Sequence, residues 1–453
     1  MPASSEPPAP EAWPQDLNGA FHNLPESRRW WVALSGGCDS TFLLYCLAAL
    51  APRHNAHLHA IHLHHGLNAS ADQWQQHCER VCDAMAVPLV SERLALDPEQ
   101  PDLEARARNA RYECFESLLE SGDLLFMAHH GDDQAETVLL RLLRGSGVRG
   151  LAGMPAEREL GSGRLVRPLL GMERRRIEAL ARDWALDWCE DSSNGDTRFD
   201  RNYLRHEIMP RLEARWPRSG RRMGRSAEHC RQAEQLLSEL ADMDARSAAS
   251  GQGISVQALA RLSGPRRQQL LRHLLIRHGC QPPGERRLAS GLEALLHAPD
   301  DGQPELRGED WRVCRFRDQL WLVPDLPVVG RDAAVEWSVG NDLEWFGTRL
   351  SAERYEGSGL AVNAGERFRI RARSGGERFR PGPGQPHRPL RKWLQEQRIP
   401  PWERAHLPLV FSGGGELVAI ADLWLAPEWR AGEGQTGWQP VWHRPWQLLK
   451  AAP

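Results

Sequence analysis

The stretch Ser35-Gly36-Gly37-Cys38-Asp39-Ser40-Thr41 directly follows the apolar run Trp30-Trp31-Val32-Ala33-Leu34. A helical apolar pattern over residues 42–49 comes next, so the order is buried strand, glycine-rich turn and helix. The glycines allow a tight turn with positive φ, in which successive amide groups converge on one anion. The helix adds the positive end of its dipole at the same place. The stretch therefore predicts a phosphate-binding loop.

The side chains of this loop suit the same role. Hydroxyl groups can donate hydrogen bonds to phosphate oxygens, and the carboxylate of Asp39 can hold a divalent cation. We assign all seven residues to nucleotide binding: Ser35, Gly36, Gly37, Cys38, Asp39, Ser40 and Thr41. An ordinary Gly-Gly turn with a helix cap is the competing interpretation. The chain has no Gly-x-x-x-x-Gly-Lys-Ser/Thr motif, so a Walker-type loop is excluded.

Length and composition set the outer limits. The chain has 453 residues, a net charge of −3 and nine cysteines without a Cys-x-x-Cys pair, so we expect two to four domains and neither a disulfide framework nor a zinc site. No apolar run is long enough to span a membrane and no leader is evident, so we expect a soluble, cytoplasmic protein with no membrane partner. Residues 1–27 are rich in Pro, Glu, Ala and Ser and read as a mobile tail.

The first two hundred residues alternate strand-like and helical patterns. Strand-like runs cover residues 31–34, 57–62, 87–93 and 124–128, and amphipathic stretches cover 42–49, 71–85 and 104–119. This order predicts the α/β class, with a doubly wound parallel sheet and ligands at the carboxyl ends of its strands. His62 ends the second strand, where we expect it beside an adenine.

A second polar cluster follows the fourth predicted strand, in the run His129-His130-Gly131-Asp132-Asp133-Gln134-Ala135-Glu136. Read as loop then helix, it places Asp132, Asp133 and Glu136 within about one turn. Carboxylates so close repel one another unless a cation offsets them, and bound Mg²⁺ or a substrate ammonium group would do so. Helix capping accounts for one carboxylate but not for three. We assign His130, at the start of this helix, to nucleotide binding.

Two arginines share a face of the helix predicted over residues 104–112. Arg108 and Arg111 are three residues apart, so both guanidinium groups can neutralise charge on a phosphate in the transition state. A surface salt bridge from Arg108 to Glu104 and a solvated Arg111 are the alternative. The residues alone leave the two interpretations even.

The loop at residues 35–40 carries the complete Ser-Gly-Gly-x-Asp-Ser signature and resembles that of the ATP-pyrophosphatase (PP-loop) superfamily. Further segments narrow the resemblance: residues 144–154, Arg167-Pro168-Leu169-Leu170, residues 188–194 and Arg201-Asn202-Tyr203-Leu204-Arg205. Together with the His-His-Gly-Asp-Asp run they resemble the catalytic domain of bacterial tRNA(Ile)-lysidine synthetases. The resemblance implies a catalytic domain over residues 28–225 with an adenine nucleotide alpha-hydrolase-like fold.

The second half of the chain supports the same resemblance. Helical patterns over residues 227–240 and 266–278 predict a helical middle domain at 226–340. The resemblance implies that this domain binds substrate or tRNA. Residues 365–448 resemble the smaller α+β C-terminal domain of longer members of that family. Within it, Arg391, Lys392 and Trp393 combine cations with a stacking surface. A buried Trp393 with solvated neighbours is the alternative.

The resemblance implies an ATP- and Mg²⁺-dependent reaction. Lysine is ligated to carbon 2 of the wobble cytidine of tRNA(Ile) with a CAU anticodon, through an adenylated tRNA intermediate. The implied partners are this tRNA, free L-lysine and ATP. The oligomeric state stays open, a homodimer included.

The same resemblance implies roles for individual residues. Asp39 holds Mg²⁺ and is catalytic together with Arg108, Arg111 and Asp132, while Asp132, Asp133 and Glu136 bind the lysine ammonium groups. The remaining substrate contacts fall on Glu190, Asp191, Arg201, Asn202, Arg205, Arg391 and Lys392.

Two alternatives remain open. Cys38 lies at a helix N-terminus, where a thiol with a lowered pKa would point to tRNA sulfur transfer by the same adenylation chemistry. The absence of a Cys-x-x-Cys pair disfavours it. The other is a non-catalytic, ATP-dependent RNA-binding protein, which the acidic cluster disfavours because binding alone needs no clustered carboxylates.

Overall fold

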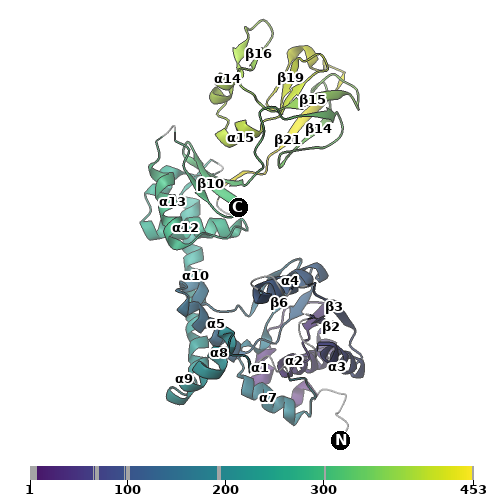
Figure 1. The fold of residues 1–453 in the computed structure, drawn as a ribbon, viewed down its shortest axis with the longest axis vertical. Helices are drawn as coiled ribbons and strands as arrows, with labels where there is room; N and C mark the ends of the chain where they lie inside the picture. The colour runs from purple at the N-terminus through teal and green to yellow at the C-terminus, as the bar shows by residue number, and fades with distance from the viewer. Residues whose placement is uncertain are drawn as a thin grey trace. The chain divides into compact units, whose positions relative to one another are not determined.

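A computed structural model of the chain describes residues 8–64, 66, 71–95, 97, 103–190, 195–251, 253–299 and 302–450. The chain forms two compact units, Met1–Leu236 and Leu237–Pro453 (Figure 1). Among the described helices, none has the length and apolar character needed to cross a membrane.

A six-stranded sheet in the order β3-β2-β1-β4-β6-β5 forms the centre of the first unit. Its strands are β1 (Arg29–Ala33), β2 (His57–His64), β3 (Leu89–Arg93), β4 (Leu124–Phe126), β5 (Glu157–Leu160) and β6 (Gly163–Val166). All neighbouring pairs are parallel except β5 and β6, which form an antiparallel hairpin. The predicted parallel α/β sheet is confirmed.

The sequence of strand β1 is apolar without interruption from Trp30 to Ala33, and the packing of the strand explains why. Side chains alternate between the two faces of a strand. Trp30 and Val32 lie in one hydrophobic core together with Phe42, whereas Trp31 lies in a second core together with Phe115. Because both faces are covered, the central positions Trp30, Trp31 and Val32 must all be apolar, whereas Arg29 at the start of the strand pairs with Glu120 and Asp123.

The helices of the first unit are α1 (Gln15–Ala20), α2 (Cys38–Leu50), α3 (Ala71–Ala84), α4 (Leu103–Leu118), α5 (Gly131–Leu143), α6 (Val148–Leu151), α7 (Arg174–Asp183), α8 (Asp200–Tyr203) and α9 (Met209–Arg215). The helices that follow β1, β2, β3 and β4 are the ones that the sequence predicts, whereas α1 lies within residues 1–27, which were expected to be a mobile tail, and its Leu17 is buried in the core. A π-helical turn at Leu204–Ile208 joins α8 to α9, and short 3-10 turns lie at Pro10–Ala12, Ala51–His54 and Pro168–Gly171. The long helix α10 (Ser219–Ser247) begins in the first unit.

The strand order places two loops together. Strand β1 pairs with β2 on one side and with β4 on the other, so the chain changes winding direction between β1 and β4. Ligands of doubly wound sheets bind in the crevice that this reversal opens at the carboxyl ends of the strands. The glycine-rich loop follows β1, and the run that contains His130 follows β4. Topology therefore brings together the two segments that the sequence singles out.

After the end of α10, the second unit contains helices α11 (Val256–Ala260), α12 (Gly264–Arg277) and α13 (Glu285–His297). Their core also includes residues of a four-stranded sheet, β22-β11-β10-β9, with strands β9 (Glu305–Arg307), β10 (Trp311–Phe316), β11 (Gln319–Pro324) and β22 (Gln447–Leu448). The range 226–340, expected to be helical, thus holds strands as well. A two-stranded pair, β7 (Ala249–Ser250) and β8 (Gly253–Ile254), precedes them.

The rest of the second unit is mostly β-structure. One sheet has the order β12-β15-β18-β19-β20, a second β13-β14-β21, and a third pairs β16 with β17. The strands are β12 (Ala334–Ser338), β13 (Leu343–Trp345), β14 (Thr348–Glu356), β15 (Arg367–Arg371), β16 (Arg378–Phe379), β17 (Arg388–Pro389), β18 (Leu409–Phe411), β19 (Leu417–Ile420), β20 (Trp424–Leu425) and β21 (Thr436–His443). Helices α14 (Leu390–Glu396) and α15 (Pro401–His406) and the 3-10 turn Pro427–Trp429 complete it.

Gly131, the first residue of α5, lies against the chain that follows β6. Its amide donates a hydrogen bond to the carbonyl oxygen of Met172 (2.7 Å), and a Cβ added there would lie 2.9 Å from the same oxygen. We predict that Gly131→Ala destabilises the chain by about 1–3 kcal/mol, because backbone must move to admit the methyl group. Urea denaturation of the whole chain measures the change.

Gly171 provides the matched control, because a Cβ added there meets nothing within 4 Å. Gly171→Ala is expected to change the free energy of unfolding by no more than about 0.5 kcal/mol. Equal effects of the two substitutions would show that helix α5 is not fixed by this contact.

Candidate active site

The loop after β1 has the tight geometry that its glycines predict. Gly36 has a φ of 84°, and a Cβ added there would lie 3.2 Å from Sγ of Cys78. Gly37 is the N-cap residue of α2. The free backbone amides of the first turn of α2 therefore point towards the loop. Backbone donors at a helix N-terminus form a ready anion site. The amide of Cys189 donates a hydrogen bond to the carbonyl oxygen of Gly36 (2.8 Å), and this bond holds the loop in place.

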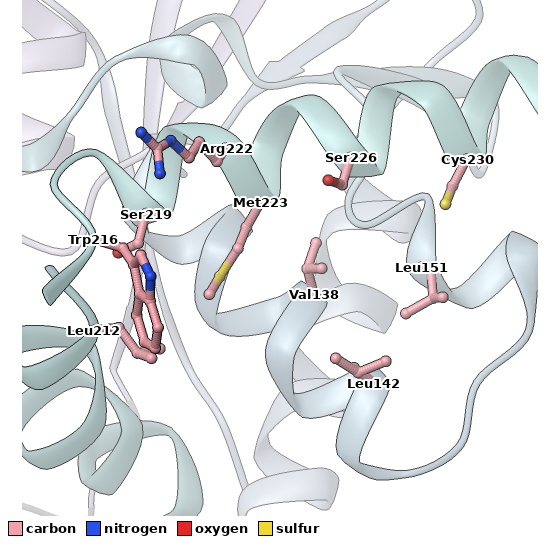
Figure 2. A pocket seen from close by; sticks show the side chains of 10 residues that line it. All are labelled: Val138, Leu142, Leu151, Leu212, Trp216, Ser219, Arg222, Met223, Ser226 and Cys230. Atoms are coloured by element: carbon pink, nitrogen blue, oxygen red, sulfur yellow. The ribbon is translucent and has the colours of Figure 1, made fainter.

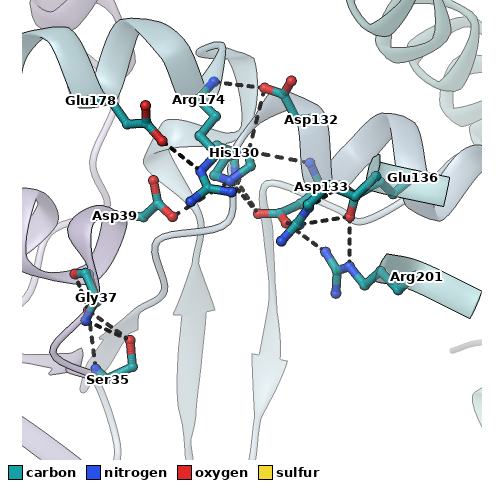
Figure 3. A network of polar contacts seen from close by, with 12 residues as sticks. Ser35, Gly37, Asp39, His130, Asp132, Asp133, Glu136, Arg174, Glu178 and Arg201 are labelled. Atoms are coloured by element: carbon teal, nitrogen blue, oxygen red, sulfur yellow. Dashed lines mark hydrogen bonds and ion pairs between the residues drawn. The ribbon is translucent and has the colours of Figure 1, made fainter. Parts of the chain in front are cut away.

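The serine hydroxyls hold the loop in shape. Oγ of Ser40 donates to the carbonyl oxygen of Gly37 (3.1 Å), and the amide of Ser35 donates to Oγ of Ser40 (3.2 Å). The two serine hydroxyls are 3.0 Å apart, and the Gly37 amide lies 3.4 Å from Oγ of Ser35 (Figure 3). Thr41 is buried, and its hydroxyl finds no hydrogen-bond partner among the described residues. Serine contacts therefore preorganise the loop.

Asp39 lies in the first turn of α2 with one carboxylate oxygen unsatisfied. Its Oδ1 is buried and has no hydrogen-bond partner in the described part of the chain, and burial raises the pKa of this carboxyl. A buried, unpartnered carboxylate oxygen suits a cation ligand. The described residues contain no group of three His, Cys, Asp or Glu side chains able to hold a metal. Mg²⁺ fits even so, because it is commonly held by one or two carboxylates together with substrate phosphates.

His130 connects the two halves of the crevice. It is the N-cap residue of α5: its Nδ1 accepts from the amide of Asp133 (3.3 Å), and the Asp133 carboxylate accepts from the His130 amide (3.0 Å). Because Nδ1 accepts, we assign the ring proton to Nε2. That nitrogen lies 3.3 Å from Oδ2 of Asp133 and 3.7 Å from Oδ2 of Asp39. The imidazole thus lies between the glycine-rich loop and the acidic helix (Figure 3).

Asp133 and Glu136 form a buried ionic network with two arginines of the same chain. Arg201 donates from Nη2 to Oδ1 of Asp133 (2.7 Å) and from Nε to Oε2 of Glu136 (2.8 Å). Arg205 donates from Nε to Oε1 of Glu136 (2.6 Å) and from Nη2 to Oδ1 of Asp133 (2.9 Å). Glu136 is only 1% exposed. The cations that offset these acids are therefore supplied internally.

The balance of charge keeps Asp133 ionised. Burial opposes ionisation, but the charge of Arg201 and the hydrogen bond from the His130 amide favour it, and the pKa of Asp133 lies below its usual value. The third acid, Asp132, behaves differently. It is more exposed, and its Oδ2 accepts a hydrogen bond from the backbone amide of Arg174 (2.7 Å), the first residue of α7. Two of the predicted acids are thus paired with arginines, and the third caps a helix.

Arg174 is a site residue that the sequence did not single out. It starts α7, and its Nε lies 3.1 Å from Oε1 of Glu178. Figure 3 shows its guanidinium group close to Asp39 and His130, and its charge favours ionisation of Asp39. The two arginines that follow it form other ion pairs: Arg175 pairs with Glu173, and Arg176 pairs with Asp16. The run of three arginines at the start of the helix was the only available signal.

Helix α4 brings two further cations to this unit. The Nε atom of Arg111 is buried without a hydrogen-bond partner among the described residues. Burial lowers the pKa of Arg111, and the charges of Arg108 and Arg201 act in the same direction. Arg108 is exposed, with its guanidinium carbon 5.5 Å from the centre of the Tyr112 ring. The side chain of Glu104, the predicted salt-bridge partner of Arg108, lies outside the described residues.

His62 and Cys38 are held within the structure around the loop. Nδ1 of His62 lies 2.9 Å from the carbonyl oxygen of Leu34 and 3.4 Å from Sγ of Cys78, and burial lowers the pKa of this imidazole. Cys38 is buried, and burial raises the pKa of its thiol to about 12. The lowered thiol pKa that the sulfur-transfer alternative requires is therefore contradicted.

The other predicted substrate residues fall in several places. Glu190 is exposed, and Asp191 lies outside the described residues. The Asn202 side chain donates to the carbonyl oxygen of Asp196 (3.0 Å). In the second unit, Arg391 and Lys392 are exposed on α14. Trp393 beside them is only 9% exposed and packs edge-on against Phe379, so the buried alternative is the one observed.

Three family models match successive parts of the chain. Residues 12–212 match the PP-loop domain, residues 254–321 the TilS substrate binding domain and residues 368–442 the TilS substrate C-terminal domain. The order agrees with the predicted resemblance. The loop after β1 and the acidic helix after β4 both fall within the PP-loop match.

Relatives match over nearly the whole chain. The tRNA(Ile)-lysidine synthase of Alkalilimnicola ehrlichii is 42% identical over 431 residues, which cover 94% of this chain and 97% of the relative. The tRNA(Ile)-lysidine synthase of Pseudomonas fluorescens is 42% identical over 430 residues, 91% of this chain and 92% of the relative. That of Coxiella burnetii is 35% identical over 429 residues, 94% of this chain and 95% of the relative. On this similarity, the chain belongs to the tRNA(Ile)-lysidine synthase family.

Proposed function

We propose that this protein ligates free L-lysine to carbon 2 of the wobble cytidine of tRNA(Ile) with a CAU anticodon, by way of an adenylated tRNA. One observation carries the proposal. A loop built for phosphates and a cluster of paired acids and arginines meet at the reversal between β1 and β4, joined by His130. A reaction that joins a nucleotide-activated base to an amino acid needs both halves within reach of one another.

The charges of the glycine-rich loop and the residues around it suggest how this part of the site would bind ATP. The amides at the start of α2 would hold the pyrophosphate of ATP, and Asp39 would hold Mg²⁺, which offsets charge on the departing pyrophosphate. The oxygen on carbon 2 of cytosine attacks the α-phosphate, and pyrophosphate leaves. Arg111 has a buried guanidinium nitrogen without a partner among the described residues, so a phosphate that gains charge in the transition state would satisfy it. Arg108, on the same helix, would add to this field.

The amino-acid half has the mixed charge that a zwitterion requires. Asp133 and Glu136 offer carboxylates to the α-ammonium group of lysine, and Arg201 and Arg205 offer guanidinium groups to its α-carboxylate. We propose that lysine binds by exchanging into these internal pairs, which leaves its ε-amine free to attack the activated carbon and release AMP. Asp132, the most exposed of the three acids, is the proposed acceptor for the proton that the amine loses.

We predict ATP-dependent incorporation of labelled lysine into a tRNA(Ile) transcript with a CAU anticodon. Incorporation should require Mg²⁺ and should disappear when the wobble cytidine is replaced by uridine, because the cytosine ring is the proposed acceptor. Acid-precipitable label measures the product. Pyrophosphate release without lysine incorporation would favour another nucleophile, such as a sulfur donor. RNA binding with neither product would leave the non-catalytic alternative.

Arg174 is proposed as a further contact to the nucleotide phosphates. Its backbone is held by Asp132 and its guanidinium group lies beside Asp39, so a phosphate on the loop would lie within its reach. We predict that Arg174→Gln slows tRNA-dependent pyrophosphate release by about tenfold to a hundredfold, the size expected for a charge-assisted hydrogen bond. Arg175→Gln is the matched control and should stay within about twofold, because Arg175 pairs with Glu173 on the surface. Equal rates for both variants would remove Arg174 from the site.

A further inference from the structure

An apolar groove of about 400 Å³ lies in the first unit between α5, α9 and α10. Its walls include Val138 and Leu142 from α5, Leu151 from α6, Trp216 after α9 and Met223 from α10 (Figure 2). Leu142 is 56% exposed and Trp216 is 53% exposed. Large apolar side chains left open together in one depression mark a binding surface.

The groove exists because α10 is fixed to the rest of the unit at two separate points. Near its start, Gly220 fits closely beside α5, where an added Cβ would lie 3.7 Å from Cβ of Ala135. Three turns later, Arg231 donates to the carbonyl oxygens of Ala152 (3.1 Å) and Met154 (3.2 Å). Between these anchors, Met223, Ser226 and Cys230 of α10 line the open space. The depression is thus a built feature of the unit.

Basic side chains accompany the apolar lining. Arg222 lines the groove and is exposed, and Arg215 and Arg218, which are exposed too, lie next to Trp216 and Ser219 in the sequence. None of these three arginines has a side-chain ion pair in the described structure. The nearby carboxylate of Glu213 is occupied by the amides of Arg218 and Ser219. An apolar protein segment would leave these cations unmatched, whereas a polyanion would pair with them. Charge therefore favours a nucleic acid as the occupant.

The groove also lies within reach of the candidate active site along one rigid element. Glu136 of the ionic network and Leu142 of the groove are six residues apart on α5, about 9 Å at the rise of an α-helix. A single-stranded loop that presents one base to the active site can therefore place a base a few nucleotides away in the groove.

We propose that this groove binds an unpaired nucleobase of the RNA substrate, stacked on Trp216, while Arg222 and the arginines next to Trp216 in the sequence contact its phosphates. The inference rests on the proposed function for the identity of the RNA. Proteins recognise single-stranded RNA loops by stacking splayed bases on aromatic rings beside a basic surface. Nothing in the adenylation or ligation steps assigns a role to Trp216, so the groove is a separate substrate site.

The test is a binding measurement with the full chain and the tRNA(Ile) transcript. Trp216→Ala should raise the dissociation constant by about tenfold to a hundredfold, as expected for the loss of one base–aromatic stack. Trp216→Phe should retain most of the affinity. Leu236→Ala is the matched control and should have no effect, because Leu236 is an exposed apolar residue of α10 outside the groove. If Trp216→Ala unfolds at a lower temperature than wild type, Trp216→Leu replaces it in the test. This variant keeps apolar volume without a stacking ring and should show the same loss of affinity.

Abasic nucleotides, introduced one at a time in the anticodon loop, identify the base. At one position the abasic transcript should bind wild type as weakly as the normal transcript binds Trp216→Ala, with no further loss when the two changes are combined. Unchanged affinity of Trp216→Ala, with wild type still incorporating lysine, would overturn the groove proposal alone. A variant that loses self-association but keeps its RNA affinity would assign the groove to a second copy of the chain and would also overturn it. If the protein incorporates no lysine, but the abasic transcript and Trp216→Ala still cause no further loss of affinity when combined, the proposed function is overturned and the groove proposal is supported.

Discussion

The parallel pairing of β1 between β2 and β4 is the constraint on which the rest of the site depends. Both faces of β1 are buried, by Trp30 and Val32 on one side and Trp31 on the other, so the strand has a single position in the sheet. That position puts the reversal of winding directly beside it. The glycine-rich loop and the acidic helix then meet because they follow adjacent strands, although about ninety residues separate them in the sequence.

The compensation of charge is the second organising feature. Glu136 and Asp133 lie on α5 and face Arg201 and Arg205, which lie four residues apart across the junction of α8 and the π-helical turn. Removing one partner of a buried ion pair typically costs 3–5 kcal/mol, so this network ties the two segments together. The proposed exchange of zwitterionic lysine into this network would keep every charge paired during the reaction. A π-helical turn at that junction is consistent with a functional position.

Much of this arrangement could be predicted from the sequence. The strand, loop and helix around Ser35–Thr41 and the parallel sheet are confirmed, because each depends on local patterns of apolar residues and glycines. The family is confirmed as well, and it was identified by the resemblance of several motifs. The clustered acids also correctly indicated that a cation must lie close by. Its source could not be predicted, since Arg201 and Arg205 are more than sixty residues away and their approach depends on tertiary packing. Spacing alone also could not select Arg174 from three consecutive arginines, nor show that Trp393 is buried. The roles of the individual site residues remain predictions.

The central claim is that the nucleotide half of the site activates the RNA base and that the charged half delivers lysine to it. The most direct measurement follows the α-phosphate of ATP, labelled with ³²P, in a reaction without lysine. We expect label to accumulate on the tRNA(Ile) transcript and to leave as AMP when lysine is added, with one lysine incorporated for each AMP released. Label that appears on lysine, or never on the tRNA, would contradict this claim.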